Sequence, residues 1–261
     1  MLQHQVSGIT SKPVVLFLHG FMGASTDWAD VMAELADAYH CLAVDLPGHG
    51  ASTGLPDGLY TMEGTAQALV DLLDGRGIER CAVVGYSMGG RLALYFAMRF
   101  PERCRVLVLE SASPGLATAQ ERAARRAVDE DRAARLERED FDTFVNEWYR
   151  QPLFASLAGQ KGLMEQMIAR RRANDPRELV RSLRGMGTGR QPSLWERLAA
   201  WRVSTVAVAG GLDAKYVEMA GRMAASSDAV RAVIVPDAGH NVHVEQPQRF
   251  VALLHTFLKQ P

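Results

Sequence analysis

Short apolar runs alternate with amphipathic helical segments along most of this chain. Val14 to Leu18 is one such run, and similar strand-like runs cover residues 40–45, 81–86 and 105–111. Helical patterns lie between them, as in residues 61–75. Runs that are apolar on both faces are typical of parallel strands, which need crossover helices to connect them. The alternation therefore predicts an α/β fold with a mostly parallel central sheet flanked by helices.

The strand signal stops in residues 114–197, which are mostly helical and rich in Ala, Arg and Glu. It returns with apolar runs over residues 203–210 and 232–237. We therefore predict a core formed by residues 1–113 and 198–261, with residues 114–197 inserted as a helical cap.

The charge of the chain is close to balanced. Its 261 residues include 29 Lys or Arg and 30 Asp or Glu, which gives a formal net charge of −1. This balance argues against a protein that binds nucleic acid or a membrane surface through its charge. Four of the basic residues are lysines, so 25 are arginines.

The three cysteines, Cys41, Cys81 and Cys104, are widely spaced and lie within apolar runs. An odd number of such thiols is typical of a reducing compartment, and their spacing matches no metal site. No window approaches the roughly 18 apolar residues that a membrane span needs, and the first residues do not resemble a signal peptide. We therefore expect a cytoplasmic protein without a metal.

Residues 85–89, Gly-Tyr-Ser-Met-Gly, match the GxSxG pattern of a nucleophile elbow. A predicted strand precedes the pattern and a predicted helix over residues 88–99 follows it, which is the context that an elbow requires. Small residues are needed because the serine is held in a strained backbone conformation that brings other segments close. The pattern predicts Ser87 as a catalytic serine, and the alternative is a glycine-rich turn with an incidental serine.

A serine hydroxyl is a weak base and a weak nucleophile until a histidine takes its proton, and an acid must orient that histidine. Asp213 follows the strand predicted over residues 203–210, at the carboxyl end where sites of open α/β sheets form. His240 follows the strand predicted over residues 232–237. The order Ser87, Asp213, His240 is the chain order of the triad in α/β-type hydrolases.

Other residues near these positions have competing interpretations. His243 is a second candidate for the base, but it lies farther than His240 from the preceding strand. Asp237 is expected to accept hydrogen bonds at the start of a turn. His19 and His49 lie beside glycines in loops, where we expect them to shape the loop rather than to react.

The loop of residues 19–23 has a second expected role. In this architecture a developing oxyanion is held by the backbone N–H of the residue after the nucleophile and by one from this early loop. We expect Met88 and Phe21 to supply these two N–H groups. Phe21 is also expected to line the pocket with its apolar side chain.

Four stretches together resemble the α/β-hydrolase superfamily over nearly the whole chain. They are HGFMG (19–23), VDLPGHGAS (44–52), GYSMGG (85–90) and AGHNVHVEQP (238–247). The resemblance implies this fold and its triad, with a helical cap inserted after the sixth strand. It does not specify the reaction, since many activities share the fold.

Four further stretches are similar to a narrower family. They are GYSMGGRLAL (85–94), ESASPGL (110–116), EWYRQPLFASL (147–157) and LRGMGTGRQPSLW (183–195). They resemble 2-succinyl-6-hydroxy-2,4-cyclohexadiene-1-carboxylate synthase, a pyruvate-releasing lyase of menaquinone biosynthesis. The last two stretches lie in the predicted cap, which generally diverges between subfamilies, so they are more specific than the elbow.

The narrower resemblance implies a small substrate with three carboxylates and a reaction that needs no cofactor and no metal. We also expect the protein to be a monomer. Ser87, made basic by His240 and Asp213, would remove a ring proton, and pyruvate would leave as its enolate. A residue-by-residue match assigns substrate binding to Tyr86, Arg91, Arg125, Trp148 and Arg171. Arg171 stands in a run of three arginines, so Arg170 and Arg172 are alternatives.

Two other functions fit part of the pattern. A carboxylesterase, or a hydrolase that cleaves a carbon–carbon bond next to a ketone, would use the same triad. The cap arginines argue against an esterase for neutral acyl groups, which would need an apolar pocket. A non-catalytic receptor would not need an intact triad together with the loop glycines Gly20 and Gly23.

The net charge is unevenly divided between the predicted cap and core. Residues 114–197 hold 15 Arg, one Lys and 13 acids, or +3, and the other residues hold 10 Arg, three Lys and 17 acids, or −4. This small asymmetry agrees with a basic lid that recruits a polycarboxylate to Ser87.

Overall fold

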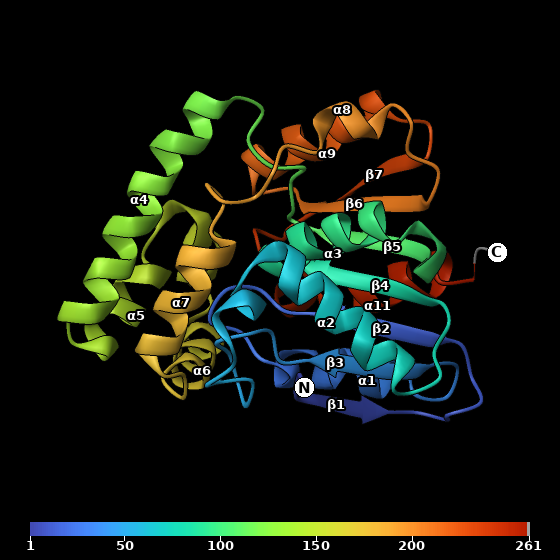
Figure 1. Ribbon diagram of the computed structural model, residues 1–261, viewed down its shortest axis with the longest axis horizontal. Coiled ribbons are helices and arrows are strands. Elements are labelled where there is room, and N and C mark those ends of the chain that lie inside the picture. Colours follow the sequence, from blue (N-terminus) through green and yellow to red (C-terminus); the bar gives the residue numbers. More distant parts are fainter. Residues whose placement is uncertain (260–261) are drawn as a thin grey trace.

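The computed structural model describes residues 1–259 of the chain. Its strands are β1 (His4–Ser7), β2 (Val14–Leu18), β3 (His40–Val44), β4 (Cys81–Tyr86), β5 (Cys104–Glu110), β6 (Ser204–Gly210) and β7 (Val230–Val235). They form one seven-stranded sheet with the spatial order β1-β3-β2-β4-β5-β6-β7 (Figure 1). β1 is antiparallel to β3, and every other neighbouring pair is parallel. The predicted α/β fold with a mostly parallel sheet is confirmed.

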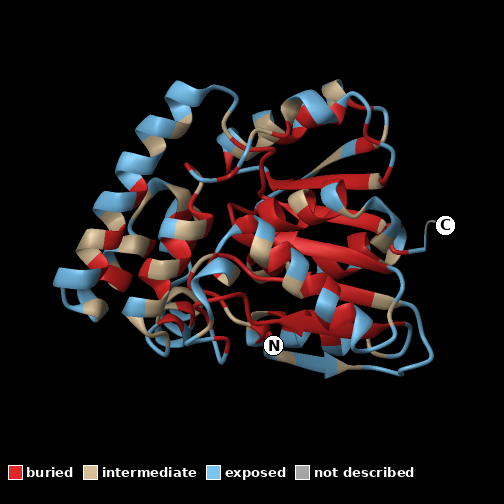
Figure 2. Cartoon of the chain, in the orientation of Figure 1, coloured by how far each residue is buried: buried red, intermediate tan, exposed pale blue. Residues whose placement is uncertain are grey.

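The apolar runs of the sequence occupy the centre of the sheet. All residues of β3 and β4 are buried, and so are four of the five residues of β2 (Figure 2). Such strands present apolar side chains to both faces, so both faces must be covered by helices.

Helices cover the two faces of the sheet (Figure 1). One face carries α2 (Met62–Asp74), α3 (Met88–Arg99), α8 (Trp195–Leu198) and α9 (Ala214–Ser226). The other carries α1 (Ala29–Leu35), α10 (Val242–Glu245) and α11 (Pro247–Phe257). The short 3₁₀ helices are η1 (Ser25–Trp28), η2 (Asp57–Tyr60) and η3 (Pro101–Arg103). Each face has its own apolar cluster, with Leu69 and Leu92 in the first and Trp28 and Phe250 in the second.

A separate helical layer lies beyond the carboxyl ends of the parallel strands and is drawn in green and yellow in Figure 1. It consists of α4 (Ala119–Arg138), α5 (Phe141–Tyr149), the 3₁₀ helix η4 (Pro152–Gly159), α6 (Lys161–Arg171) and α7 (Pro176–Met186). These helices pack around Phe144, Leu157 and Leu179. Met22, from the loop after β2, belongs to the same cluster, so this layer, the cap, rests on that loop.

The cap follows the fifth strand of the chain rather than the sixth, which corrects the expectation drawn from the family resemblance. Five strands, β1 to β5, precede the first helix of the cap, α4. No apolar run marks β1, since it is a short edge strand whose residues are exposed or half-buried.

The remaining differences from the predicted elements are small. β7 ends at Val235, two residues before the predicted end, because Pro236 has no N–H for the sheet and Asp237 turns with a φ of 58°. Residues 260 and 261, the end of the predicted core segment 198–261, lie outside the described residues. No helix in the described part of the chain is long and apolar enough to cross a membrane.

Candidate active site

Ser87 lies in the turn between β4 and α3, where the sequence predicts a nucleophile elbow. Its backbone has φ 49° and ψ −106°, which is a strained conformation for a residue with a side chain. A Cβ at position 85 would lie 2.5 Å from the Gly89 carbonyl oxygen, and one at position 89 would lie 2.2 Å from the Leu18 carbonyl oxygen. The two glycines of the motif therefore let the elbow pack against itself and against β2.

The structure brings Ser87, His240 and Asp213 into one hydrogen-bonded chain. The Ser87 hydroxyl donates to Nε2 of His240 at 3.1 Å, and Nδ1 of His240 donates to Asp213 at 2.7 Å. Asp213 follows β6 and His240 follows β7, so two neighbouring strand ends supply these partners. Because Asp213 binds the Nδ1 proton, Nε2 is left to accept the proton of Ser87.

The loop that carries His240 is held by Glu245, a residue that no sequence pattern predicted. The buried carboxylate of Glu245 accepts hydrogen bonds from the N–H groups of Gly239, at 2.9 Å, and Asn241, at 3.2 Å. These are the two neighbours of His240, so the charged acceptor fixes the loop on both sides of the base. The sequence could have suggested this role, because Glu245 and His240 lie in one short stretch, AGHNVHVEQP.

The alternative acid and base candidates, Asp237 and His243, take no part in the hydrogen bonds that join Ser87, His240 and Asp213. Nδ1 of His243 donates to Glu110 at 2.8 Å, and its ring stacks on Trp28 with 4.3 Å between centroids. Asp237 is exposed and lies in the turn after β7. His240 is therefore the histidine that the fold places at Ser87.

His19 and His49 serve the loops in which they lie. Nδ1 of His19 donates to the next carbonyl group at 2.7 Å, and its Nε2 accepts the N–H of Leu46 at 3.0 Å. Nδ1 of His49 donates to the carbonyl of Pro47 at 3.1 Å. Neither histidine is among the residues that line the pocket at the serine.

Two backbone donors lie beside the serine. Phe21 and Met88 both line the pocket that contains Ser87. Within residues 1–259, neither of their backbone N–H groups donates a hydrogen bond to the protein. The Gly23 N–H donates to the Gly20 carbonyl at 2.9 Å, which closes the turn that carries Phe21. Unengaged donors of this kind are what a site for a developing oxyanion requires.

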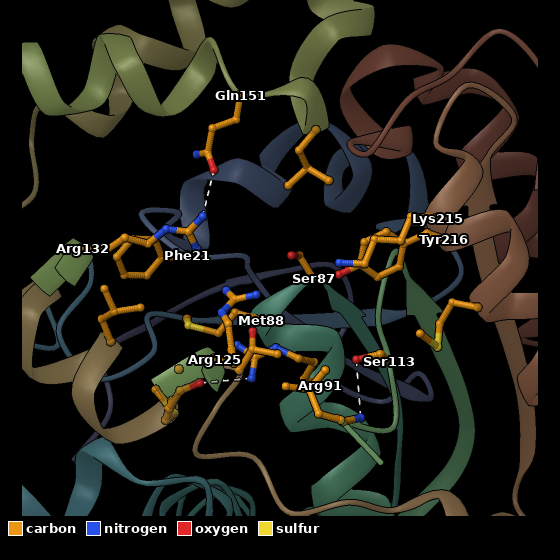
Figure 3. A pocket seen from close by; sticks show the side chains of 18 of the residues that line it. Phe21, Ser87, Met88, Arg91, Ser113, Arg125, Arg132, Gln151, Lys215 and Tyr216 are labelled. Carbon is orange, nitrogen blue, oxygen red and sulfur yellow. Dashed lines mark hydrogen bonds between the residues drawn. The ribbon is translucent and has the colours of Figure 1, made fainter. Parts of the chain in front are cut away.

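A pocket of about 280 Å³ opens at Ser87 between the core and the cap (Figure 3). Its cationic side chains come from both units and are Arg91, Arg125, Arg132 and Lys215. No Asp or Glu is found among the described residues that line it. Its apolar and aromatic walls include Phe21, Met88, Trp148, Leu153 and Tyr216. A recessed site with charge of one sign favours a ligand of the opposite sign.

Arg91 lies one helical turn past Ser87, as the spacing predicts, and its N–H donates to the Ser87 carbonyl at 2.9 Å. Its buried guanidinium donates to the carbonyl of Met186 at 3.0 Å and to the side chain of Gln191 at 3.4 Å. Both acceptors are neutral, and burial lowers the pKa of Arg91 to about 10. Within residues 1–259, Arg91 forms no ion pair, so a carboxylate entering the pocket could pair with it directly.

Two arginines of α4 reach the pocket from the cap. Arg125 donates to Asp129 at 2.7 Å, and Arg132 donates to the side chain of Gln151 at 3.0 Å. The guanidinium of Arg132 also lies 5.2 Å from the ring centroid of Trp148. No motif predicted Arg132, although it lies two helical turns after Arg125 and therefore on the same helix face.

Tyr86 lies behind the triad rather than in the pocket. Its ring centroid is 5.5 Å from that of His240 and 5.1 Å from that of His243. It is not among the lining residues. The structure therefore does not bring Tyr86 to the substrate pocket, contrary to the expectation, and its position indicates support for the His240 ring.

Arg171 also lies outside the pocket, which corrects its expected role. Its buried guanidinium donates to Asp27 at 2.8 Å and to the Tyr149 hydroxyl at 2.9 Å, and so links α6 of the cap to η1 of the core. Its alternatives, Arg170 and Arg172, do not line the pocket either. A sequence motif could not show that Arg171 meets Asp27, because the two residues are far apart in the sequence.

Replacing Arg171 with Met is expected to lower the free energy of unfolding by about 3–5 kcal/mol, because Asp27 stays buried without its partner. Burial opposes ionisation of Asp27, but Arg171 outweighs it and lowers the pKa of this carboxyl. The ion pair therefore stabilises the fold at pH values above the usual aspartate pKa. This contribution to stability is lost as the pH falls through the lowered pKa of Asp27. Urea denaturation at several pH values should show the difference between the two chains shrinking in acid.

The control is Arg177→Met, which removes an exposed partner of Asp175 and should change stability little. A fully stable Arg171→Met chain with weakened substrate binding would instead place Arg171 in the substrate site.

The fold and the triad define the class of this protein. A model of the alpha/beta hydrolase family matches residues 15–253, and the chain belongs to this family.

Relatives narrow the assignment. The 2-succinyl-6-hydroxy-2,4-cyclohexadiene-1-carboxylate synthase of Enterobacter sp. (strain 638) is 36% identical, over 97% of this chain and 94% of that protein. The structure of MenH from S. aureus has a TM-score of 0.93 and 33% identity, covering 99% of this chain and 98% of that one. Protein PHYLLO of Arabidopsis thaliana is 34% identical over 98% of this chain, which spans 16% of that relative's length. Within the hydrolase family, the chain belongs to the 2-succinyl-6-hydroxy-2,4-cyclohexadiene-1-carboxylate synthases.

Proposed function

We propose that this chain eliminates pyruvate from 2-succinyl-5-enolpyruvyl-6-hydroxy-3-cyclohexene-1-carboxylate to give 2-succinyl-6-hydroxy-2,4-cyclohexadiene-1-carboxylate, a step of menaquinone biosynthesis. The observation that carries the proposal is the pocket at Ser87, where four cations and, among the described residues, no carboxylate line the walls. The substrate has three carboxylates, and arginine binds this group through paired hydrogen bonds. A pocket for neutral esters would not need this charge.

Ser87 is the base of the proposed reaction. Its proton passes to Nε2 of His240, 3.1 Å away, and its oxygen then removes a proton from the cyclohexene ring. The electrons of that C–H bond move through the ring, and the C–O bond to the enolpyruvyl group breaks. Pyruvate leaves as its enolate and takes up a proton, so no water is consumed. Asp213 stabilises the imidazolium that forms on His240.

The backbone donors of Phe21 and Met88 act on the charge that this step creates. When the ring proton is removed, negative charge builds on a carbonyl or carboxylate of the substrate. Donors that are already oriented stabilise this charge without further rearrangement. Their freedom from other hydrogen bonds within the described chain supports this role.

In this proposal, residues of both the cap and the core bind the substrate. Residues 114–197 form the cap, which contributes Arg125 and Trp148, and the core contributes Arg91. The two guanidiniums bind carboxylates, and the Trp148 ring covers the cyclohexene ring.

We also propose that the enzyme works as a monomer in the cytoplasm. Its three cysteines are buried free thiols, which suits a reducing compartment. The triad, the two backbone donors and the pocket cations all come from one chain, so a second copy is not needed to complete the site.

Incubation with the enolpyruvyl substrate tests the function, with pyruvate followed by its reduction with lactate dehydrogenase and NADH. The unmodified chain is expected to release one pyruvate per substrate and to turn over a neutral p-nitrophenyl ester poorly. Arg91→Met is expected to lower kcat/KM by about tenfold to a hundredfold, because a charged hydrogen bond to a carboxylate is lost.

Other outcomes would contradict the proposal in distinct ways. Rapid ester turnover that disappears in Ser87→Ala, with no pyruvate released from the acidic substrate, would identify a hydrolase. Binding of the acidic substrate at full occupancy without turnover would identify a receptor.

A further inference from the structure

Lys215 is a pocket residue to which neither the sequence motifs nor the triad assigns a role. It is the second residue of α9 and lies two positions after Asp213. The pocket that contains Ser87 is lined by Lys215 and by the next residue, Tyr216, whose ring centroid is 4.8 Å from that of His240. Because Asp213 is bound to His240, the first turn of α9 is held against the triad. In Figure 3, Lys215 and Arg132 lie on opposite sides of Ser87.

The ammonium of Lys215 differs from the other pocket cations in its surroundings. Arg91, Arg125 and Arg132 each donate a hydrogen bond to an oxygen of the protein. Within residues 1–259, Lys215 has no such hydrogen bond and no ion pair, and its ammonium lies 5.4 Å from the ring centroid of Tyr216. Lys215 is therefore a positive charge that the fold leaves available.

Neighbouring cations repel the positive charge of Lys215. The residue as a whole is exposed, but partial burial of its ammonium lowers the pKa of this group. The guanidiniums of Arg125 and Arg132 lower this pKa further, while the carboxylate of Asp213 raises it. An anion in the pocket would remove the repulsion, since it would interact with all of these cations at once.

We propose that Lys215 binds a carboxylate of the substrate on the core side of the pocket, opposite the arginines of α4. The proposal rests on the function proposed above and adds Lys215 and Arg132 to the two guanidiniums, Arg91 and Arg125, that bind carboxylates there. Arg125 and Arg132 hold the acidic ligand from the cap, and Arg91 and Lys215 hold it from the core. The compact ammonium of a lysine suits a carboxylate that presents a single oxygen, whereas a guanidinium suits one that presents both.

Binding of the enolpyruvyl substrate to an inactive chain tests this role directly. In the Ser87→Ala background, titration calorimetry should give a dissociation constant about tenfold higher after Lys215→Met, and a smaller increase after Lys215→Arg, which keeps the charge. Lys161→Met is the matched control, because it removes a lysine charge from the exposed start of α6 and should not change affinity. In chains that retain Ser87, reaction with a neutral phosphonate should be equally fast with and without Lys215, which separates carboxylate binding from support of the triad.

The possible results separate this proposal from the proposed function. If the Ser87→Ala chain binds the substrate and Lys215→Met leaves the dissociation constant unchanged, the Lys215 site is refuted and the function stands. Equal weakening by Lys161→Met would also refute it, since the effect would then come from overall charge. If the Ser87→Ala chain does not bind the substrate at all, both proposals fail.

Discussion

Replacing Ser87 with alanine is expected to reduce kcat for pyruvate release by about a thousandfold or more. The substitution removes the oxygen that accepts the ring proton, while His240, Asp213 and the pocket cations remain. KM should change little, because the groups that bind the carboxylates are unaltered. The backbone at this position keeps a positive φ of 49° in the unmodified chain, and alanine tolerates that conformation no worse than serine. Steady-state kinetics with the coupled pyruvate assay measures both constants.

Ser113→Ala is the matched control for this prediction. Ser113 lines the same pocket, but its hydroxyl accepts the N–H of Gly115 at 3.4 Å and, within residues 1–259, has no histidine partner. Its loss should leave kcat within about threefold of the unmodified chain. If Ser87→Ala retained most of its activity, His240 or another group would be the base, and the elbow serine would have no part in the elimination.

The triad was predictable from the sequence because each of its members is fixed by local structure. Ser87 is part of a glycine-flanked turn, and Asp213 and His240 each follow a buried strand. In a parallel sheet, the carboxyl ends of neighbouring strands meet at one edge, so strand order alone brings such residues together. The 3.1 Å and 2.7 Å contacts of His240 agree with this reasoning.

The positions of the arginines proposed to bind substrate were only partly predictable, because they depend on which acids lie nearby in space. Arg91 is one turn from Ser87, so helix geometry places it at the pocket. Arg171 instead meets Asp27, a partner far away in the sequence, and is used to join the cap to the core. Arg132 and Lys215 line the pocket without belonging to any motif. Long-range pairing of this kind leaves no local signal in a sequence.

Replacing Asp213 with asparagine is expected to lower kcat by about 10³ to 10⁴-fold while leaving the fold intact. The Asp213 carboxylate accepts the Nδ1 proton of His240 at 2.7 Å, which leaves Nε2 as an acceptor for Ser87. An asparagine amide that donates to Nδ1 would move the ring proton to Nε2. His240 could then no longer accept a proton from Ser87, and no positive charge could be stabilised on its ring.

The same substitution preserves the structural role of residue 213, which makes the kinetic effect interpretable. The Asp213 side chain also accepts the N–H of Tyr216 at 3.3 Å at the start of α9, and asparagine caps helices about as well as aspartate does. Thermal unfolding of Asp213→Asn should therefore stay close to that of the unmodified chain. Asp237→Asn, in the exposed turn after β7, is the control for the loss of one negative charge. Near-normal pyruvate release by Asp213→Asn would mean that another acceptor orients His240. If Asp213→Asn loses activity and Asp237→Asn does not, the carboxylate of Asp213 is the group that orients His240.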